Sequence, residues 1–109
     1  MATSYKVLGQ VNPSASTQTT AYTVPSATQA VISTIVVSNL GPTATTYRIA
    51  IQPAGASLVQ QHYIAYDVTL SSLDSIALTI GVTLAATDVI SVMSFNGLVN
   101  FNIFGSEIA

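Results

Sequence analysis

Apolar and polar residues alternate along several short stretches of this chain. In Thr45–Gln52 the odd-numbered residues from Tyr47 onward are large and apolar, and the even-numbered ones from Arg48 onward are polar or small. Leu98–Phe104 alternates in the same way. A period of two places one set of side chains on each face of a β-strand. The pattern therefore predicts half-buried strands in both stretches.

Glycine, proline and asparagine cut the remaining chain into pieces of strand length. Gln29–Asn39 is apolar on both faces in its middle, which predicts a central strand covered on both sides. Asn96-Gly97 predicts a type I′ hairpin that joins a strand over Asp88–Phe95 to Leu98–Phe104. Thr83–Thr87 is ambiguous. The other predicted strands are Tyr5–Val11, Ala21–Val24, Tyr63–Leu70 and Ser75–Ile80, the last with Ile76, Leu78 and Ile80 inward.

These pieces predict an all-β fold, an antiparallel β-sandwich of about eight strands with jelly-roll or Greek-key wiring. The length of 109 residues fits a single domain over 1–109. Asn12–Thr20 is small, polar and uncharged, and it is either a surface loop or an extended arm that lies over a neighbouring subunit. Good helix formers such as Glu, Lys and Arg are nearly absent, so no amphipathic helix is expected.

Charge is scarce, because Asp, Glu, Lys and Arg make up only 6% of the residues, against about a quarter in an ordinary soluble domain. Mean hydropathy is +0.58. A free monomer normally stays soluble through its charge, so we expect much of this surface to be covered by copies or partners. Two cationic residues cannot follow a phosphate backbone, so no nucleic-acid partner is expected.

Other compositional features exclude further classes of site. The chain has no cysteine, which removes disulfides and thiolate metal sites and favours assembly in a reducing cytoplasm. The most apolar run, Ala30–Val37, is much shorter than the roughly 18 residues of a spanning helix, and the N-terminus does not read as a signal peptide. We therefore expect no membrane partner.

The segment QQHYIAYD contains the densest cluster of functional side chains: His62, Tyr63, Tyr66 and Asp67. One histidine and four scattered acids make a metal site or an acid–base pair improbable, and no nucleophile motif such as GxSxG is present. Asp74 and Asp88 are expected to cap turns. We therefore predict no catalytic, metal or cofactor site and no enzyme. His62 and the tyrosines are expected at an interface or in the core, with sugar contact as an alternative for the tyrosines.

Arg48 lies on the polar side of its strand and is expected to pair with Asp67 or Glu107, across strands or between subunits. An anionic ligand is the alternative. The predicted subunit or capsid interface therefore comprises Arg48, His62, Tyr63, Tyr66 and Asp67.

Three long stretches, residues 6–39, 45–67 and 79–108, carry a resemblance to a known group of proteins. Its most specific segments are LGQVNPSAST, YRIAIQPAG, HYIAYD and FGSEI. The chain resembles small virion structural proteins from tailed phages of cyanobacteria and other aquatic bacteria. The resemblance implies a particle component and carries no catalytic motif.

The resemblance implies a homotrimeric capsid cement (decoration) protein first. Such a protein binds over capsomer junctions of the major capsid protein in the virion, after assembly in the host cytoplasm. Alternatives are a tail, baseplate or fibre component, or a receptor- or glycan-binding module. A closed homo-oligomer would also cover strand edges that otherwise invite aggregation.

Overall fold

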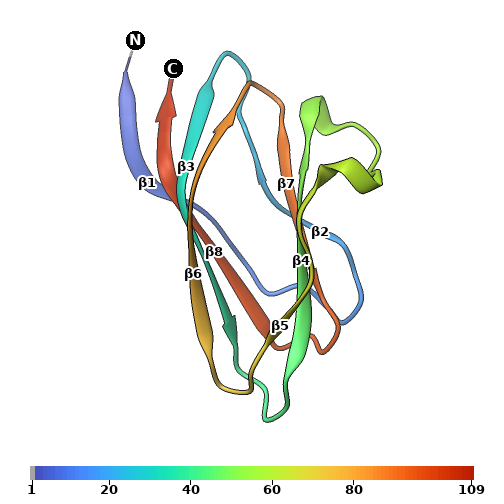
Figure 1. The fold of residues 1–109 in the computed structure, drawn as a ribbon. Helices are drawn as coiled ribbons and strands as arrows, with labels where there is room; N and C mark the ends of the chain where they lie inside the picture. The colour runs from blue at the N-terminus through green and yellow to red at the C-terminus, as the bar shows by residue number, and fades with distance from the viewer. Residues whose placement is uncertain (1) are drawn as a thin grey trace.

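A computed structural model describes residues 2–109, which form two antiparallel four-stranded sheets packed face to face (Figure 1). Sheet A has the order β1-β8-β3-β6 and sheet B the order β2-β7-β4-β5. The expected all-β sandwich of about eight strands is confirmed. Two 3-10 helices, η1 (Pro53–Gly55) and η2 (Gln60–His62), lie between β4 and β5. The strands are β1 (Thr3–Val11), β2 (Thr19–Thr23), β3 (Gln29–Asn39), β4 (Thr45–Gln52), β5 (Tyr63–Leu70), β6 (Ser75–Leu84), β7 (Val89–Ser94) and β8 (Val99–Ile108).

The wiring of the two sheets follows one simple rule. The first strand pairs with the last, β2 with β7, β3 with β6, and β4 with β5, all antiparallel. The chain is thus a long antiparallel hairpin with its tip at β4–β5, rolled up so that β3 also meets β8 and β4 meets β7. This is jelly-roll wiring, one of the two alternatives that the strand pattern predicts.

The core lies between the two sheets and is built from the inward side chains of both. Tyr47 of β4 and Phe101 of β8 meet edge to face, with ring centroids 6.1 Å apart. Burial of aromatic and branched aliphatic side chains between sheets is the main stabilising term of such a fold. Across residues 2–109 we find no helix long and apolar enough to cross a membrane.

The predicted hairpin at Asn96-Gly97 is wrong. β7 belongs to sheet B and β8 to sheet A, so residues 95–98 carry the chain between sheets. Gly97 has a φ of +69°, but Asn96 is not among the positive-φ residues that a type I′ turn requires. Instead, the Asn96 side-chain oxygen accepts the Leu98 N–H at 2.9 Å. Long-range pairing of β8 with β1 and β3 overrides the local turn signal.

Two predicted burial patterns need correction, and the inward direction predicted for Ile76 is confirmed with only partial burial. β3 is central in sheet A, but its outward Val31 and Val36 are only half-buried, because no second layer covers that face. Ile76 of β6 points inward opposite Val37 but stays 39% exposed, because β6 is an edge strand. Ala50, on the expected polar face of β4, is fully buried between Ser91 and Tyr63 of the adjacent strands.

Residues 12–18, which belong to the stretch considered as an arm or a loop, form a loop held to the chain's own sandwich. The Asn12 amide donates to the Val99 carbonyl at 2.9 Å, and the Ser16 N–H donates to the Ser94 carbonyl at 2.7 Å. Thr19 and Thr20 already belong to β2. The ambiguous Thr83–Thr87 divides in a similar way, with β6 running to Leu84 before a turn begins.

Candidate functional site

A bulge in β5 brings together four of the five predicted interface residues. The register between β4 and β5 shifts so that Tyr66 and Asp67 both oppose the single residue Arg48. Asp67 has a φ of +52°, the left-handed conformation that asparagine and aspartate tolerate best after glycine. Bulges commonly redirect side chains in this way. Arg48, Tyr66 and Asp67 therefore meet on the outer face of sheet B, with Tyr63 beside them.

The Arg48 guanidinium is held on several sides. Its Nε donates to Asp67 Oδ1 at 2.5 Å and its second nitrogen donates to Asp67 Oδ2 at 3.1 Å, a bidentate pair. Its carbon lies 4.1 Å from the Tyr66 ring centroid and 5.2 Å from that of Phe95. The hydrogen bond to Asp67 raises the pKa of Arg48, and the same bond lowers the pKa of Asp67. The predicted pairing of Arg48 with Asp67 is confirmed.

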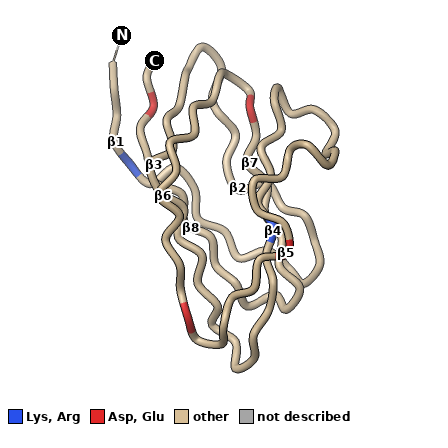
Figure 2. The backbone as a smooth tube through the Cα atoms, viewed as in Figure 1, with Lys and Arg blue, Asp and Glu red and all other residues tan. Residues whose placement is uncertain are grey.

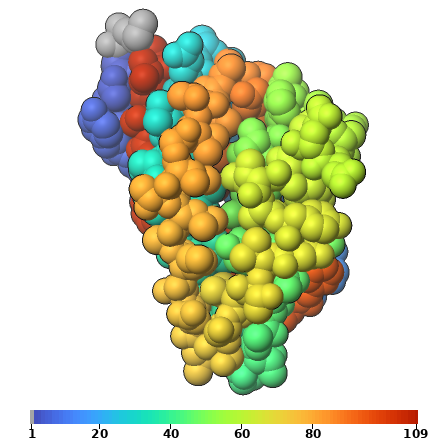
Figure 3. Space-filling model, in the orientation of Figure 1, coloured from blue at the N-terminus to red at the C-terminus, as the bar shows by residue number. Residues whose placement is uncertain are grey.

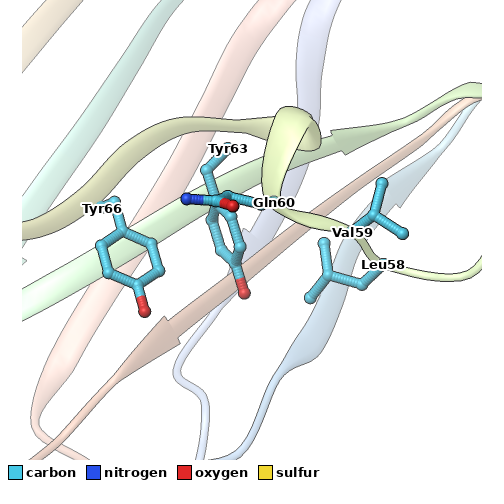
Figure 4. Close-up of a pocket in the computed structure, with 5 residues that line it drawn as sticks. All are labelled: Leu58, Val59, Gln60, Tyr63 and Tyr66. Atoms are coloured by element: carbon cyan, nitrogen blue, oxygen red, sulfur yellow. The ribbon is translucent and has the colours of Figure 1, made fainter.

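A groove runs beside this cluster, with a volume of about 660 Å³ (Figure 4). The Tyr63 and Tyr66 rings stand edge to face at 4.8 Å and project from the same side of β5, with Gln60 next to them. Leu58 and Val59 complete the lining. The groove thus combines an apolar wall with two phenol hydroxyls and one amide.

His62 is near the cluster in sequence but has a different local role. It ends η2, and its Nδ1 accepts the Val59 N–H at 3.2 Å, which closes that turn. It does not line the groove. The structure therefore separates His62 from the other four predicted interface residues.

The remaining acids serve the fold. Asp88 accepts the Ala54 N–H at 2.8 Å and the Ala85 N–H at 2.9 Å, and Asp74 accepts the Ser75 N–H at 2.8 Å. Both predicted turn caps are confirmed. Within residues 2–109 no three histidine or acidic side chains come together as a metal site.

Glu107 of β8 connects the two sheets through its side-chain carboxylate. It accepts the Tyr22 hydroxyl at 2.5 Å and pairs with Lys6 Nζ at 2.7 Å. These hydrogen bonds, that of Lys6 first, hold the pKa of Glu107 below its usual value. Burial, and then the bond to Glu107, raises the pKa of Tyr22. Glu107 is therefore not the partner of Arg48, which was the other pairing expected from the sequence.

The outer face of sheet A forms a second surface, and the rows of side chains across it contain no charged residue, although Lys6 borders its hollow. Its side chains lie in five rows across the strands, set by the register, and each row is neutral. Tyr5 on this face is 84% exposed, and Val7, Val31 and Phe104 form an apolar patch with it. Within the strands of sheet A, charge is confined to Lys6 of β1 and Glu107 of β8, whose register places them on the inner face; the other charged residues lie on sheet B or in turns (Figure 2). The rows are Thr3-Ile108-Gln29, Tyr5-Ser106-Val31-Thr83, Val7-Phe104-Thr34-Thr79, Gln10-Asn102-Val36-Ala77 and Asn100-Ser38-Ser75.

Sequence reasoning missed Phe95 and the groove residues Leu58, Val59 and Gln60. Phe95 follows β7, and only the pairing of Ser94 with Tyr47 brings it near Arg48. No local sequence pattern predicts that pairing. The groove residues lie in the β4–β5 connection, whose path no periodic pattern predicts.

Comparison of the chain with known protein families, with curated proteins and with solved structures finds no match.

Proposed function

We propose that this chain is a non-enzymatic structural subunit of a phage particle, most simply a capsid cement protein that binds over junctions of the major capsid protein. The observation that carries the proposal is the outer face of sheet A, whose rows contain no charged residue and whose apolar patch around Tyr5, Val7 and Phe104 is bordered by Lys6. A nearly neutral, partly apolar face is costly to leave in water and well suited to a protein partner.

Two further observations support a structural role. Each acid, Arg48, Lys6 and His62 takes part in an ion pair, a cap or a turn within the chain, so none is left as an obvious acid, base or nucleophile. Jelly rolls are common among viral capsid domains. That second point is an analogy between folds, and it adds weight only because the sequence also resembles virion proteins. The same resemblance implies the three-fold symmetry of a homotrimer.

Quantitative mass spectrometry of purified particles tests this role. A cement protein should approach the copy number of the major capsid protein. A copy number that is a small fraction of it would move the chain to the tail, baseplate or fibre. Absence from washed particles would contradict both.

A receptor- or glycan-binding role is the second candidate, supported by the groove beside Tyr63 and Tyr66. Exposed aromatic rings offer a face to the apolar side of a sugar, and Gln60 offers an amide for its hydroxyls. Binding of the purified protein to host cells, lost in Tyr66→Ala, would favour this role. Equal binding by the wild type and Tyr66→Ala would remove the groove from consideration.

A further inference from the structure

β6 is a free edge of sheet A with little protection against pairing. Its only strand neighbour within residues 2–109 is β3, and its sequence SIALTIGVTL contains no charged residue and no proline. Free edges present unpaired N–H and C=O groups, and natural proteins usually protect them with charge, proline, bulges or shortness. Short, neutral segments of high β-propensity are those that pair between chains. β6 thus offers a ready template for another strand.

The other three edges are better protected. β1 carries Lys6 and a register shift after Val7, and β2 has only five residues with a shift of its own. β5 has two register shifts and carries Asp67 in the left-handed conformation. β6 also has a register shift, where Ile80 and Gly81 face the single residue Ser33. It is nevertheless the only one of these four edges that is both longer than five residues and free of charge, so a partner strand is expected there.

The flank beside β6 exposes side chains that point toward the core. Val68 of β5, opposite the buried Tyr47, is 37% exposed, and Ile76 of β6, opposite the buried Val37, is 39% exposed. Figure 3 looks onto this flank, with β6 in orange and β5 in yellow. Both residues are aliphatic, so the partner that covers them has to be apolar and uncharged there.

We propose that β6 pairs with β6 of a second copy of this chain, antiparallel, around a two-fold axis at Leu78. The strand reads alike in both directions about that residue. Leu78 then opposes Leu78 of the second copy, Ile76 opposes Ile80, and Ala77 opposes Thr79. Large aliphatic side chains meet on the inner face and small ones on the outer face. Self-complementarity of this kind is what an isologous interface requires.

The same geometry covers the exposed flank. A two-fold axis perpendicular to sheet A makes one continuous eight-stranded sheet and brings the two β5–β6 flanks toward each other. Neither copy presents a charge on β6, so no like charges meet at the contact.

Pairing of β6 with β1 of a second copy is less favourable. Lys6 is on the inner face of β1, in register with Gly105 and Ile32. In a shared sheet it would join the row of Leu78 and Ile80 side chains. It is also engaged by Glu107 at 2.7 Å, and moving it would leave that carboxylate with one partner fewer.

The inference stands apart from the proposed role on a particle, since it concerns the purified protein alone. A two-fold contact cannot by itself build a trimer. The expected assembly is a dimer, or six chains if a three-fold contact is also present. If the chain dimerises but is missing from particles, the proposed function is contradicted and this inference is not.

The first test is the mass of the purified protein in solution, measured by light scattering across a concentration series. The wild type should have an even multiple of the 11.3 kDa chain mass. Thr79→Lys on the exposed side of β6 should raise the dissociation constant at least about tenfold. Thr20→Lys, the matched change on the exposed side of β2, should leave it unchanged. A monomeric or trimeric wild type, or equal masses for both variants, would overturn the proposal.

Cysteine cross-linking tests the register and does not depend on how well Thr79→Lys folds. The chain has no cysteine of its own. In the proposed register Ala77→Cys and Thr79→Cys together place two cysteine pairs directly opposite each other, within reach of a disulfide. Either single variant places its cysteines only diagonally. Cross-linked dimers in the double variant alone are expected. No cross-link, or equal cross-linking in a single variant, would contradict the register.

Discussion

The two open sides of the sandwich differ sharply, although each lies between an edge strand of sheet A and one of sheet B. On the β1–β2 side the strands lie against each other, and Glu107 joins the sheets through Tyr22 and Lys6. On the β5–β6 side the strands contact each other less, and inward aliphatic residues remain exposed. One side is closed by the chain itself. The other side exposes aliphatic residues, as expected of a surface that is covered by another chain.

The largest expected difference in unfolding free energy is between alanine substitutions at two strand glycines. A Cβ on Gly9 of β1 would clash with the Ala21 carbonyl oxygen of β2, whereas a Cβ on Gly81 of β6 would meet nothing within 4 Å. Gly9→Ala should lower the free energy of unfolding by about 1–3 kcal/mol through overpacking. Gly81→Ala should leave it unchanged or raise it by up to about 1 kcal/mol. Urea denaturation of both variants measures this, with Gly81→Ala as the control, and equal effects would show that Gly9 is not packed tightly against β2.

The next largest effect on stability is expected at Glu107, whose contacts with Tyr22 and Lys6 clamp the β1–β2 side. The side chain of Glu107 is only 13% exposed, and its removal leaves the Tyr22 hydroxyl half-buried without its partner. Glu107→Ala should cost about 1–3 kcal/mol of unfolding free energy. Tyr22→Phe should cost less, about 1 kcal/mol, because Lys6 still holds the carboxylate. If Glu107→Ala unfolds at the wild-type urea concentration, the clamp does not stabilise the fold.

The same carboxylate should make stability depend on pH. Its pKa in the folded chain lies below the ordinary 4.5, so it stabilises the fold fully above that value. The stabilisation is lost as pH falls through the lowered folded pKa. The free energy of unfolding should therefore be nearly level from neutral pH to about 5 and then decline. Glu107→Gln should reduce that decline, although the lowered pKa of Asp67 leaves part of it. An unchanged decline would assign it to other groups.

The smallest effect on stability is expected on the outer face of sheet B. Arg48 and Asp67 form an accessible pair, and such pairs contribute little to unfolding free energy. Arg48→Ala should shift the thermal midpoint less than Glu107→Ala does. A larger shift would mean that the Arg48 stack on Tyr66 and Phe95 supports the fold.

The sequence predicts strand bounds well where glycine, proline or polar turn residues flank the strand. Gln29–Asn39, Thr45–Gln52 and Tyr63–Leu70 have the predicted bounds residue for residue, because glycine, proline or polar turns flank them. The turn at Asn96-Gly97 was misread, because its signal is local whereas β8 is placed by pairing with strands far away in the chain. A jelly roll depends mainly on such long-range pairs.

The candidate site shows the same division. Arg48 and Asp67 were expected to meet because their strands are neighbours in sequence and opposite charges favour pairing across strands. Phe95 was missed because it reaches Arg48 only through the β4–β7 register. His62 was grouped with the cluster by sequence proximity, but its side chain closes the η2 turn.

Hydrogen exchange of the β6 amides in the purified wild-type protein tests the central claim most directly. A free edge strand exposes half of its N–H groups to water, whereas a strand paired on both sides protects them. The account predicts that Ser75–Leu84 exchanges about as slowly as the central strand β3, and that Thr79→Lys removes this protection. Fast exchange along β6 in the wild type, at concentrations where the protein is used, would contradict it.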